Sequence, residues 1–345
     1  MKILMIGLGS IGQRHLRNIK ALYGDKYEII AYRVRGLSQT FSKDMKIREG
    51  VNLEQEFGIK AFYDLDSALN EKPDIAFITN ITSEHMKCAI KCAEAGCSLF
   101  IEKPLSNDLK DVSVLKEIIE KNKIIAFMGF QNRYNCVVAE LKKLLLEGVL
   151  GKIVCANVEM GERLETMHSY EDYSTTYMAN KSMGGGVILN QAIHEIDYIH
   201  WLFGKPEKVY AVGGKVTSLK IDVEDSCSAI FTVNKGNHKF PIYLHADFIQ
   251  SPAKRLCKVI GEKGYIEIDL LNNSITKCIH NKDVEYKKYE DFERNLMFIN
   301  ELEDFMQSVI EKKEPKISLD DGIISLQMAI AMKKSLNNDS IVYIE

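Results

Sequence analysis

The sequence predicts an α/β protein with two parts. A doubly wound parallel sheet is expected over residues 1–125, followed by an α+β domain with a mostly antiparallel open sheet over residues 126–345. Three observations predict this fold class. The 345 residues suffice for about two domains. Short apolar runs alternate with helical patterns in the first third of the chain, whereas β-rich stretches joined by short turns dominate from residue 154 to residue 287.

In the first domain, each apolar run has the length of one buried strand. These runs lie at residues 2–6, 27–34, 75–79, 98–101 and 124–128. Helical patterns separate the runs at residues 11–23, 83–95 and 107–121, and Gly96 ends the second helix. Strands that alternate with helices of this length imply parallel βαβ crossovers, so we expect helices on both faces of the sheet.

In the second domain, the strand signals are joined by hairpin-like turns such as residues 234–237 and 261–264. The strand signals lie at residues 208–216, 226–233, 242–248, 258–260 and 265–268. Helical patterns lie at residues 138–146, 187–203, 292–311 and 320–336. We expect these helices to cover one face of the antiparallel sheet, and the last helix to pack back on the first domain.

The segment GLGSIG carries the strongest functional signal. It follows the first predicted strand and opens the first predicted helix. In that setting glycines allow a tight turn and a close approach of the backbone, while the helix N-terminus faces a pyrophosphate. The motif therefore predicts a dinucleotide site formed by Gly7, Gly9, Ser10, Ile11 and Gly12.

The end of the second predicted strand bears on the choice of cofactor. An acidic residue roughly 20 positions after the glycines commonly binds the ribose 2′-hydroxyl of NAD. Here the strand ends AYRVR without a carboxylate, and Arg33 lies 21 residues after Gly12. A cation suits a 2′-phosphate, so the sequence weakly favours NADP(H) over NAD(H). The alternative is a solvated arginine beside an NAD site.

Composition excludes several classes of partner. Lys and Arg number 45 against 48 Asp and Glu, a net charge of −3, whereas a general nucleic-acid binder carries a concentrated positive surplus. No uncharged apolar run reaches the roughly 18 residues that a membrane helix needs. The N-terminal apolar stretch lacks a signal-peptide cleavage site and is followed at once by Arg14, His15 and Arg17. We therefore expect a cytoplasmic enzyme with a small-molecule substrate, no nucleic-acid partner and no membrane contact.

The eight cysteines are spread through the chain and include no paired CxxC, so we expect reduced thiols and no metal site. The spacing of His85, Cys88, Cys92 and Cys97 also allows a zinc interpretation. Steps of three and four residues, however, place small apolar side chains on one helical face, and buried helix packing is the interpretation we favour.

Five motifs together resemble the Gfo/Idh/MocA family, the glucose-fructose oxidoreductase and inositol dehydrogenase-like enzymes. They are GLGSIG, TNITSEH at residues 79–85, IEKPL at residues 101–105, GFQNRY at residues 129–134 and GGGVILNQAIH at residues 184–194. The motifs follow the family order over essentially the whole chain. The resemblance implies a Rossmann domain followed by an open-sheet domain, with the substrate held between them near the nicotinamide.

The resemblance also implies a catalytic pair. Lys103 would lie beside the nicotinamide ribose and the substrate, and His194 would accept the proton. Elementary chemistry agrees, because oxidising a secondary alcohol requires removal of the hydroxyl proton and a histidine titrates near neutrality. A lysine cation can lower the pKa of the hydroxyl while the cofactor carries the hydride. The matching motifs imply further cofactor contacts from Thr79, Asn80, His85, Glu102, Lys103 and Gln131.

Each catalytic candidate also has a structural alternative. Lys103 could be a surface lysine at a strand end, and His194 could be a hydrogen-bonded histidine in a helix interface. Asp197 lies three residues after His194, so it could orient that imidazole or bind another group.

The substrate side shows one departure from the family pattern. Many sugar and inositol dehydrogenases of the family carry aspartate four residues before the histidine, where this chain has Asn190. Asparagine donates and accepts hydrogen bonds but cannot hold a proton. We expect Asn190 to hold a substrate hydroxyl. Its surroundings resemble the family branch acting on nucleotide-linked amino sugars, notably UDP-N-acetylglucosaminuronate 3-dehydrogenases, and other segments resemble members that serve surface-sugar biosynthesis.

Residues 160–181 form a polar-aromatic segment, which includes His168, just before the glycine triplet. Long irregular segments often form binding loops. We expect Arg163 and Lys181 to bind an anionic part of the substrate, with simple solvation as the alternative. Arg133 and Tyr134 of the GFQNRY motif are further candidates for substrate contacts.

The sequence thus predicts an NAD(P)-dependent oxidoreductase acting on a secondary hydroxyl or keto group of a sugar, sugar nucleotide or cyclitol in surface-sugar biosynthesis. One alternative is a glycoside-processing enzyme in which tightly bound NAD cycles in place. A second is a non-catalytic dinucleotide-sensing protein on the same fold, against which the presence of both Lys103 and His194 argues. Because the family tends to associate through the outer face of the second sheet, we expect a homodimer or homotetramer.

Overall fold

The computed structural model describes residues 1–34, 40–42, 47–48, 50–167 and 170–345. The described chain forms two compact units. The first contains Met1–Gly129 and Phe298–Gly322, and the second contains Phe130–Met297 and Ile323–Glu345. The chain thus leaves the first unit close to the expected boundary at residues 125 and 126, and then returns to it. No helix within the described ranges is long and apolar enough to span a membrane.

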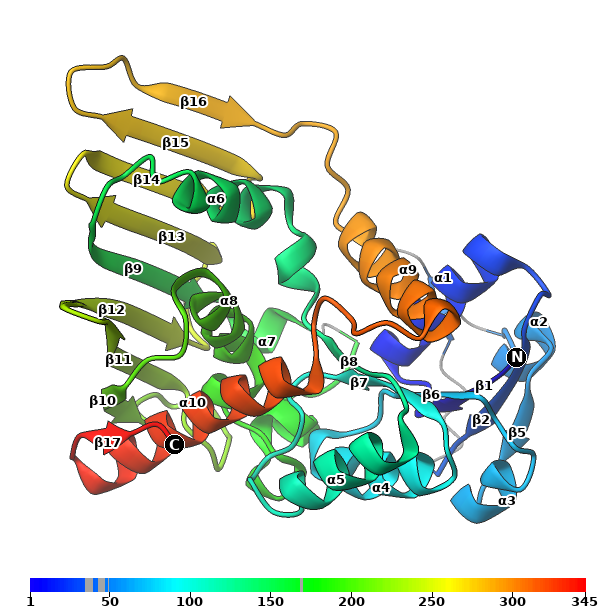
Figure 1. Ribbon diagram of the computed structural model, residues 1–345. Helices are drawn as coiled ribbons and strands as arrows, with labels where there is room; N and C mark the ends of the chain where they lie inside the picture. The colour runs from blue at the N-terminus through cyan, green and yellow to red at the C-terminus, as the bar shows by residue number, and fades with distance from the viewer. Residues whose placement is uncertain (35–39, 43–46, 49, 168–169) are drawn as a thin grey trace. The chain divides into compact units, whose positions relative to one another are not determined.

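The first unit is built on a six-stranded parallel sheet (Figure 1), which confirms the predicted doubly wound class. Its order is β5 (Lys60–Phe62), β2 (Glu28–Tyr32), β1 (Lys2–Ile6), β6 (Ile75–Ile78), β7 (Ser98–Glu102) and β8 (Ala126–Gly129). The apolar residues of β6 are all buried, because helices cover both faces of the sheet. Strand β5 was not predicted, since three residues are too few for a periodic signal.

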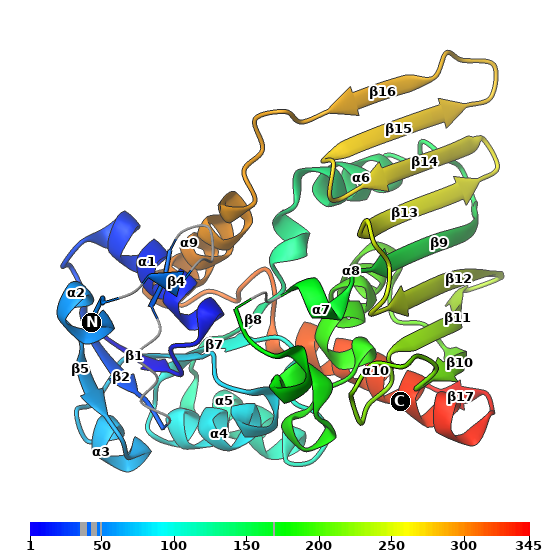
Figure 2. The same ribbon diagram turned by 180° about the vertical axis from the view of Figure 1, so that it is seen from behind.

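Helices α4 and α5 cover one face of this sheet, and α1 with α9 covers the other (Figures 1 and 2). The helices are α1 (Ser10–Tyr23), α2 (Leu53–Phe57), α3 (Leu65–Leu69), η1 (Thr82–Glu84), α4 (His85–Glu94), α5 (Val112–Asn122) and α9 (Asn295–Glu311), and a small ribbon pairs β3 (Thr40–Phe41) with β4 (Ile47–Arg48). The helix expected from residue 107 begins only at Val112, because Asp111 adopts a left-handed backbone conformation with φ +58°.

The segment that returns to the first unit carries most of α9 and the first turn of α10 (Leu319–Asn338). The physical reason for this return is the aromatic face of α9. The ring of Phe305 lies 5.5 Å from the ring of Phe77, 5.5 Å from that of Phe100 and 5.8 Å from that of Phe127. Ser318 then pairs with Phe127 through an isolated antiparallel bridge.

The second unit contains a nine-stranded sheet that is antiparallel except where β12 pairs with β9. Its order is β16 (Glu285–Lys288), β15 (Ser274–Ile279), β14 (Gly264–Asp269), β13 (Lys254–Gly261), β9 (Ile153–Gly161), β12 (His238–Asp247), β11 (Ser226–Lys235), β10 (Lys208–Gly214) and β17 (Val342–Tyr343). Burial alternates along β11, as expected for a sheet with one covered face.

Helices cover that one face of the second sheet, as Figures 1 and 2 show for α6, α8 and α10. The helical segments of this unit are η2 (Gln131–Tyr134), α6 (Cys136–Leu146), α7 (Leu164–Met167), η3 (Tyr173–Thr175), η4 (Tyr177–Ala179), η5 (Lys181–Met183), the π-helix η6 (Ile188–Ala192), α8 (Ile193–Phe203) and the remainder of α10. The helix expected over residues 187–203 is therefore a π-turn that continues into an α-helix.

Candidate functional site

The glycine motif forms a tight turn between β1 and α1. Gly7 has φ +85°, and a Cβ on it would lie 2.8 Å from the Cα of Asn80. A Cβ on Gly12 would lie 2.3 Å from the carbonyl oxygen of Gly7. A Cβ on Gly9 would meet no atom of the described chain within 4 Å. Two glycines therefore allow the turn to close, and the third leaves space for a pyrophosphate beside the helix N-terminus, which begins at Ser10.

The structure brings Thr79 and Asn80, at the end of β6, against this turn. The Thr79 hydroxyl lies 2.6 Å from the carbonyl oxygen of Gly7 and 3.0 Å from that of Ile6. The Asn80 Oδ1 atom is buried without a partner in the described part of the chain. The turn and its polar neighbours thus fit a nicotinamide dinucleotide.

His85 supports the same strand ends from the start of α4. Its Nδ1 lies 2.8 Å from the carbonyl oxygen of Pro104, and its Nε2 lies 3.0 Å from that of Asn80. Burial lowers the pKa of His85 despite these two acceptors. A neutral imidazole has one N–H, so it donates to one of the two carbonyls. His85 therefore links the segment after β7 to the segment after β6. Cys88 and Cys92 are buried on the same helix.

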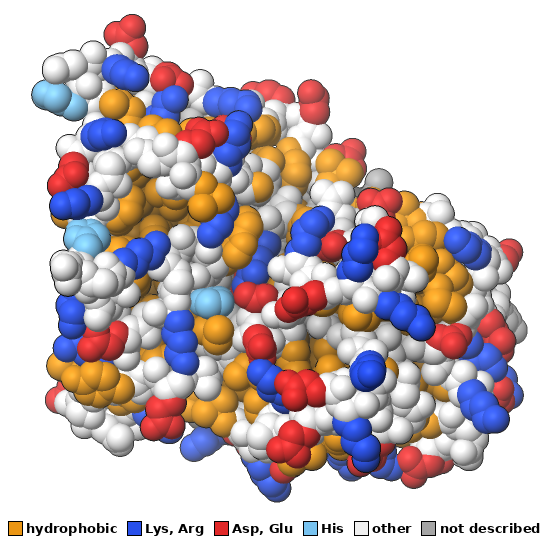
Figure 3. All heavy atoms as spheres, in the orientation of Figure 1, with side chains coloured by type: hydrophobic (Ala, Val, Ile, Leu, Met, Phe, Trp, Pro, Cys, Tyr) orange, Lys and Arg blue, Asp and Glu red, His pale blue; other side chains and the backbone are white. Residues whose placement is uncertain are grey.

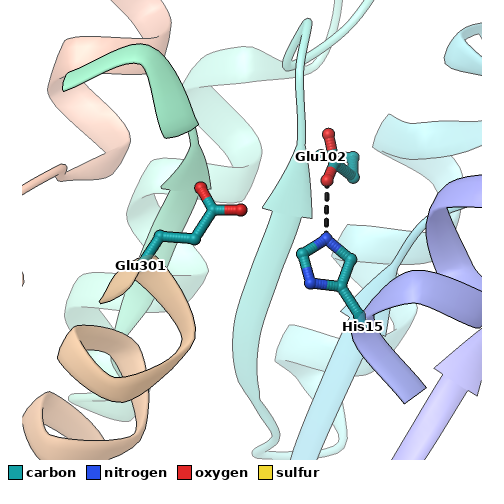
Figure 4. Close-up of side chains that lie close together, drawn as sticks. All are labelled: His15, Glu102 and Glu301. Atoms are coloured by element: carbon teal, nitrogen blue, oxygen red, sulfur yellow. Dashed lines mark hydrogen bonds and ion pairs between the residues drawn. The ribbon is translucent and has the colours of Figure 1, made fainter. Parts of the chain in front are cut away.

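Lys103 follows the last residue of β7, and a buried hydrogen-bond network holds that strand end (Figure 4). The Lys103 amide donates to Glu102 Oε2 at 3.2 Å. Glu102 Oε1 lies 2.7 Å from His15 Nε2, which comes from α1. Both Glu102 and His15 are buried, and the His15 ring packs 4.7 Å from the ring of Phe100. Glu102 therefore anchors the peptide that carries Lys103.

Glu301 of α9 points toward this pair (Figure 4), and sequence reasoning missed it. Its side chain is fully buried, and neither carboxyl oxygen has a partner among the described residues. Burial, and to a lesser degree the negative charge of Glu102, raise the pKa of Glu301 well above its ordinary value. The available signal was an acidic residue at position 301 within the apolar stripe that includes Phe298, Leu302 and Phe305.

These three side chains also form a possible ligand set. One ligand atom from each of His15, Glu102 and Glu301 lies within 4.8 Å of the other two. The sequence predicts no metal site, and its zinc-like spacing concerns His85 and three cysteines instead of these residues. A protonated Glu301 explains the burial of the second carboxyl group without an ion.

Arg33 lies next to β2 and is held by main-chain and side-chain contacts. Its amide donates to the carbonyl oxygen of Phe62 at 2.9 Å. Its Nη1 donates to Glu54 Oε1 of α2 at 2.5 Å, and the side chains are 10% and 31% exposed. The guanidinium is therefore mostly covered and paired with a carboxylate, and the choice between NAD(H) and NADP(H) stays a prediction.

In the second unit, glycines shape the entry to the π-helix that carries Asn190. A Cβ on Gly185 would lie 2.6 Å from the carbonyl oxygen of Met178, and one on Gly186, where φ is +109°, would lie 2.2 Å from Glu224 Oε1. Asn190 is buried, and its Nδ2 donates to the carbonyl oxygens of Gly184 at 3.2 Å and Gly186 at 3.0 Å. Asn190 therefore holds the turn itself, a role that the sequence did not indicate.

An ion pair between Lys333 and Glu224 supports this turn. Lys333 of α10 donates to the two carboxylate oxygens of Glu224 at 3.1 and 3.3 Å. The Glu224 carbonyl oxygen accepts from the Val187 amide at 3.0 Å. Glu224 thus joins α10 to the segment that leads into the π-helix, and π-turns of this kind frequently mark functional sites.

His194 lies in the first turn of α8 and is 5% exposed. Its Nε2 lies 3.4 Å from Gln131 Nε2, and the Phe130 ring lies 6.5 Å from the imidazole in an edge-on arrangement. The motif at residues 129–134 and the motif at residues 184–194 therefore meet within the second unit. Gln131, expected among the cofactor contacts, lies beside the proposed proton acceptor.

Asp197 forms a buried ion pair with Arg133 of η2. Arg133 Nε and Nη2 donate to the two Asp197 oxygens at 2.9 and 2.7 Å, and the Ser325 hydroxyl lies 3.3 Å from Asp197 Oδ1. The Arg133 and Asp197 side chains are 4% and 0% exposed. Breaking one partner of such a buried pair costs about 3–5 kcal/mol. Arg133 therefore has a structural task that ties η2 to α8.

The remaining candidates lie at or near the surface. Arg163 Nε forms an ion pair with Glu165 Oε2 at 2.7 Å, and Lys181 is exposed, with its amide donating to Asp222 Oδ1 at 2.6 Å. Tyr134 is half-buried at the end of η2. His168 lies outside the described residues. On the face shown in Figure 3, positive and negative side chains are interspersed, in line with the nearly balanced charge of the chain.

Comparison with known families matches both parts of the chain. Residues 1–130 match a family described as an oxidoreductase family with an NAD-binding Rossmann fold. Residues 138–267 match the GFO/IDH/MocA C-terminal domain. The two matches fall in the order that the sequence motifs indicated.

Individual relatives cover the whole chain. A myo-inositol 2-dehydrogenase from Thermotoga maritima is 26% identical over 100% of this chain and 99% of its own. The structure of a levoglucosan dehydrogenase in complex with NADH and levoglucosan superposes with a TM-score of 0.83 at 17% identity, covering 100% and 99% of the two chains. The WlbA dehydrogenase from Bordetella pertussis, in complex with NADH and UDP-GlcNAcA, gives a TM-score of 0.81 at 20% identity with the same coverage. These structures show the fold.

Proposed function

The chain belongs to the Gfo/Idh/MocA family of oxidoreductases, and from that premise we propose that it transfers hydride between a nicotinamide cofactor and a secondary hydroxyl or keto carbon of a sugar, sugar nucleotide or cyclitol, in surface-sugar biosynthesis. It is an NAD(P)-dependent dehydrogenase of CH–OH groups. The printed substrates of its relatives, an inositol, levoglucosan and a UDP-linked sugar acid, support a polyhydroxylated substrate. The glycine turn closed by Thr79 is the single observation that carries the proposal.

The residues around that turn are the proposed cofactor contacts. Gly7, Gly9, Ser10, Ile11 and Gly12 would cradle the pyrophosphate, and Thr79, Asn80, His85 and Glu102 shape the adjoining strand ends. Gln131 stays a proposed cofactor contact because it belongs to the GFQNRY motif at residues 129–134. When bound, the nicotinamide accepts or supplies the hydride. The chain itself would exclude bulk water and orient the reacting carbon.

We assign the proton transfer to His194 and the polarisation of the substrate hydroxyl to Lys103. As general base, the His194 imidazole would remove the hydroxyl proton during oxidation, and it would return that proton during reduction. The Lys103 ammonium would hold the hydroxyl oxygen and stabilise the developing negative charge. The burial of His194 beside Gln131 and the anchoring of Lys103 through Glu102 support these roles.

Substrate recognition is proposed to involve Asn190, Tyr134, Arg163 and Lys181. Asn190 lies four residues before His194 on the same helical segment, and its Oδ1 would accept a hydrogen bond from a substrate hydroxyl while its Nδ2 holds the turn. Arg163 and Lys181 would bind an anionic group such as a diphosphate. Arg133 contributes through Asp197, because its guanidinium is already paired.

The cofactor preference is proposed to be weakly in favour of NADP(H). Arg33 lies at the strand end where a 2′-phosphate is recognised, and the residue before it, Tyr32, is bound to the glycine turn, because its carbonyl oxygen accepts from the Gly7 amide at 3.1 Å. The eight free thiols support a reducing, cytoplasmic setting.

The decisive experiment is a substrate screen with both cofactors. UDP-amino sugars, inositols and aldoses are offered with NAD⁺ and with NADP⁺, and the absorbance of the reduced nicotinamide is followed. We expect turnover with at least one member of these classes and a higher kcat/KM with NADP⁺. A strong preference for NAD⁺ would overturn the proposed cofactor choice. Cofactor that survives gel filtration, together with glycoside cleavage, would favour the glycoside-processing alternative.

We also propose that the protein is a homodimer or homotetramer that associates through the outer face of the second sheet. Val212, Ile230 and Tyr243 are 56%, 44% and 42% exposed there. Ile230 pairs across strands with Tyr210 on one side and with Tyr243 on the other. Tyr210, Ile230 and Tyr243 therefore form one row. An exposed apolar row on a broad sheet is typical of a protein–protein interface.

A further inference from the structure

Glu54 forms an ion pair with Arg33, the residue that we propose to contact the ribose 2′ group of the cofactor. Arg33 follows β2, whose last residue, Tyr32, accepts a hydrogen bond from the first glycine of the motif. Glu54 comes from α2, which lies 21 residues further along the chain. The sequence at the strand end shows no carboxylate, yet the fold places one against the guanidinium.

The contact has the features of a competing ligand. Arg33 Nη1 donates to Glu54 Oε1 at 2.5 Å, and the arginine side chain is 10% exposed, so water screens the pair only partly. A carboxylate and a phosphate use the same planar N–H groups of arginine. A 2′-phosphate bound at Arg33 would therefore compete with the Glu54 carboxylate for the same N–H groups.

We propose that Glu54 is a specificity-determining residue, which weakens NADP(H) binding by pairing with Arg33 and so keeps the cofactor preference small. This inference rests on the proposed function, because it needs a dinucleotide at the glycine turn. A 2′-phosphate must either displace the Glu54 carboxylate from Arg33 or bind beside it against electrostatic repulsion. The uncharged 2′-hydroxyl of NAD(H) carries neither of these free-energy costs. Glu54 acts through its ion pair with Arg33.

The neighbouring charges supply a matched control. Glu56 lies on the same short helix and pairs with Arg48 at 2.6 Å, with a carboxylate as exposed as that of Glu54. Glu54→Gln and Glu56→Gln each remove one negative charge from α2. Only the first removes the ion pair between Glu54 and Arg33.

The test measures the Kd of NADH and of NADPH by nicotinamide fluorescence on the full chain. We expect Glu54→Gln to raise the preference for NADPH, expressed as the ratio of the two Kd values, about tenfold, as suits the loss of one charged hydrogen-bond competitor. Glu56→Gln should change that ratio less than about twofold, as expected for a screened charge. An equal change in both variants would overturn the specific role of Glu54.

A double-mutant cycle tests whether Glu54 acts through Arg33. Arg33→Ala alone should lower the preference for NADPH. In the Arg33→Ala background, Glu54→Gln should leave the ratio unchanged, whereas a helix that merely shifts would move it in both backgrounds. If neither cofactor binds the parent protein, the proposed function fails. If both bind and Glu54→Gln leaves their ratio as it was, this inference alone fails.

Discussion

At the scale of single residues, the position of Lys103 depends on its neighbour Glu102. The Glu102 carboxylate accepts from the Lys103 amide and contacts a buried imidazole 87 residues earlier in the chain. Because the Glu102 and His15 side chains are both buried, water cannot replace their hydrogen bond, and the strand end is held in one conformation. The Glu–Lys sequence thus combines an anchoring residue with the residue proposed to act on the substrate.

The proton-acceptor role of His194 is tested by removing its imidazole. His194→Ala should lower kcat by about two to four orders of magnitude, because a positioned general base contributes that much. His200→Ala is the matched control, since His200 lies on the same helix α8 and is outside the proposed site. Steady-state kinetics with a substrate from the screen gives both values. Activity of His194→Ala within threefold of the parent would refute the assignment.

Glu301 makes the stability of the first unit depend on pH. Its pKa is raised in the folded state, so above pH ~4.5 the folded chain binds more protons than the unfolded chain, and stability falls as pH rises toward the folded pKa. Glu301→Gln mimics the neutral acid and removes this dependence. The variant should therefore gain stability relative to the parent with rising pH, by up to about 1.4 kcal/mol per pH unit.

Denaturant unfolding between pH 5 and 8.5 measures this difference. Glu303→Gln, an exposed change on the same helix, is the control and should keep the pH slope of the parent. The protonated-acid interpretation would be wrong if Glu301→Gln destabilised the protein equally at all pH values. An ion held by the three side chains would instead show as a stabilisation of the parent, but not of Glu301→Gln, by added divalent cations.

At the scale of elements, the π-turn before α8 has a specific support. The glycines at 185 and 186 let the chain pass close to three carbonyl oxygens and to Glu224, and Asn190 then binds the turn from within. Lys333 neutralises Glu224 from α10. The geometry of Asn190 and His194 is therefore set by a turn and a distant helix as well as by the helix that carries them.

Gly186→Ala tests this support. The alanine Cβ would meet Glu224 Oε1 and would also require a left-handed backbone, so we expect a loss of about 2–4 kcal/mol in stability, together with a fall in kcat. Gly236→Ala is the control: its φ is +64°, but a Cβ there would meet no atom within 4 Å. It should cost only the backbone strain, about 1 kcal/mol. Equal losses in the two variants would mean that the Glu224 contact is unimportant.

The longer elements were predictable, and the short ones were not. Strand β1 and the helical segment of η6 and α8 carry periodic or continuous apolar patterns, and the bounds of β1, and of η6 and α8 taken together, follow the expectation closely. Strand β5 and helix α2 are three and five residues long, too short for a period to show. Helix α2 nevertheless supplies Glu54, so an element that the sequence did not reveal bears on cofactor choice.

At the scale of the whole molecule, the outer face of the nine-stranded sheet is the proposed contact between copies of the chain. Tyr243→Glu places a charge in the exposed row, next to Ile230, and should convert the oligomer into a monomer, because an unpaired buried charge opposes association. Tyr63→Glu, on an exposed tyrosine of the first unit, should leave the oligomer intact. Light scattering after gel filtration gives the mass of each. A parent protein that is already a monomer would contradict the proposal.

The sequence by itself determined the fold class, the order of the two parts and the family, because alternating apolar runs, the glycine turn and the motifs are local patterns. It also indicated which residues to propose for the chemistry. Family membership is shown by the two family matches over residues 1–130 and 138–267.

The tertiary structure alone decided which side chains meet. It pairs Arg33 with Glu54, Arg133 with Asp197 and Glu102 with His15, and it places Glu301 beside that last pair. None of these partners follows from periodicity, since periodicity shows that a side chain is buried but not what it faces. A buried charge needs a partner, and only the folded chain brings together residues that are far apart in sequence.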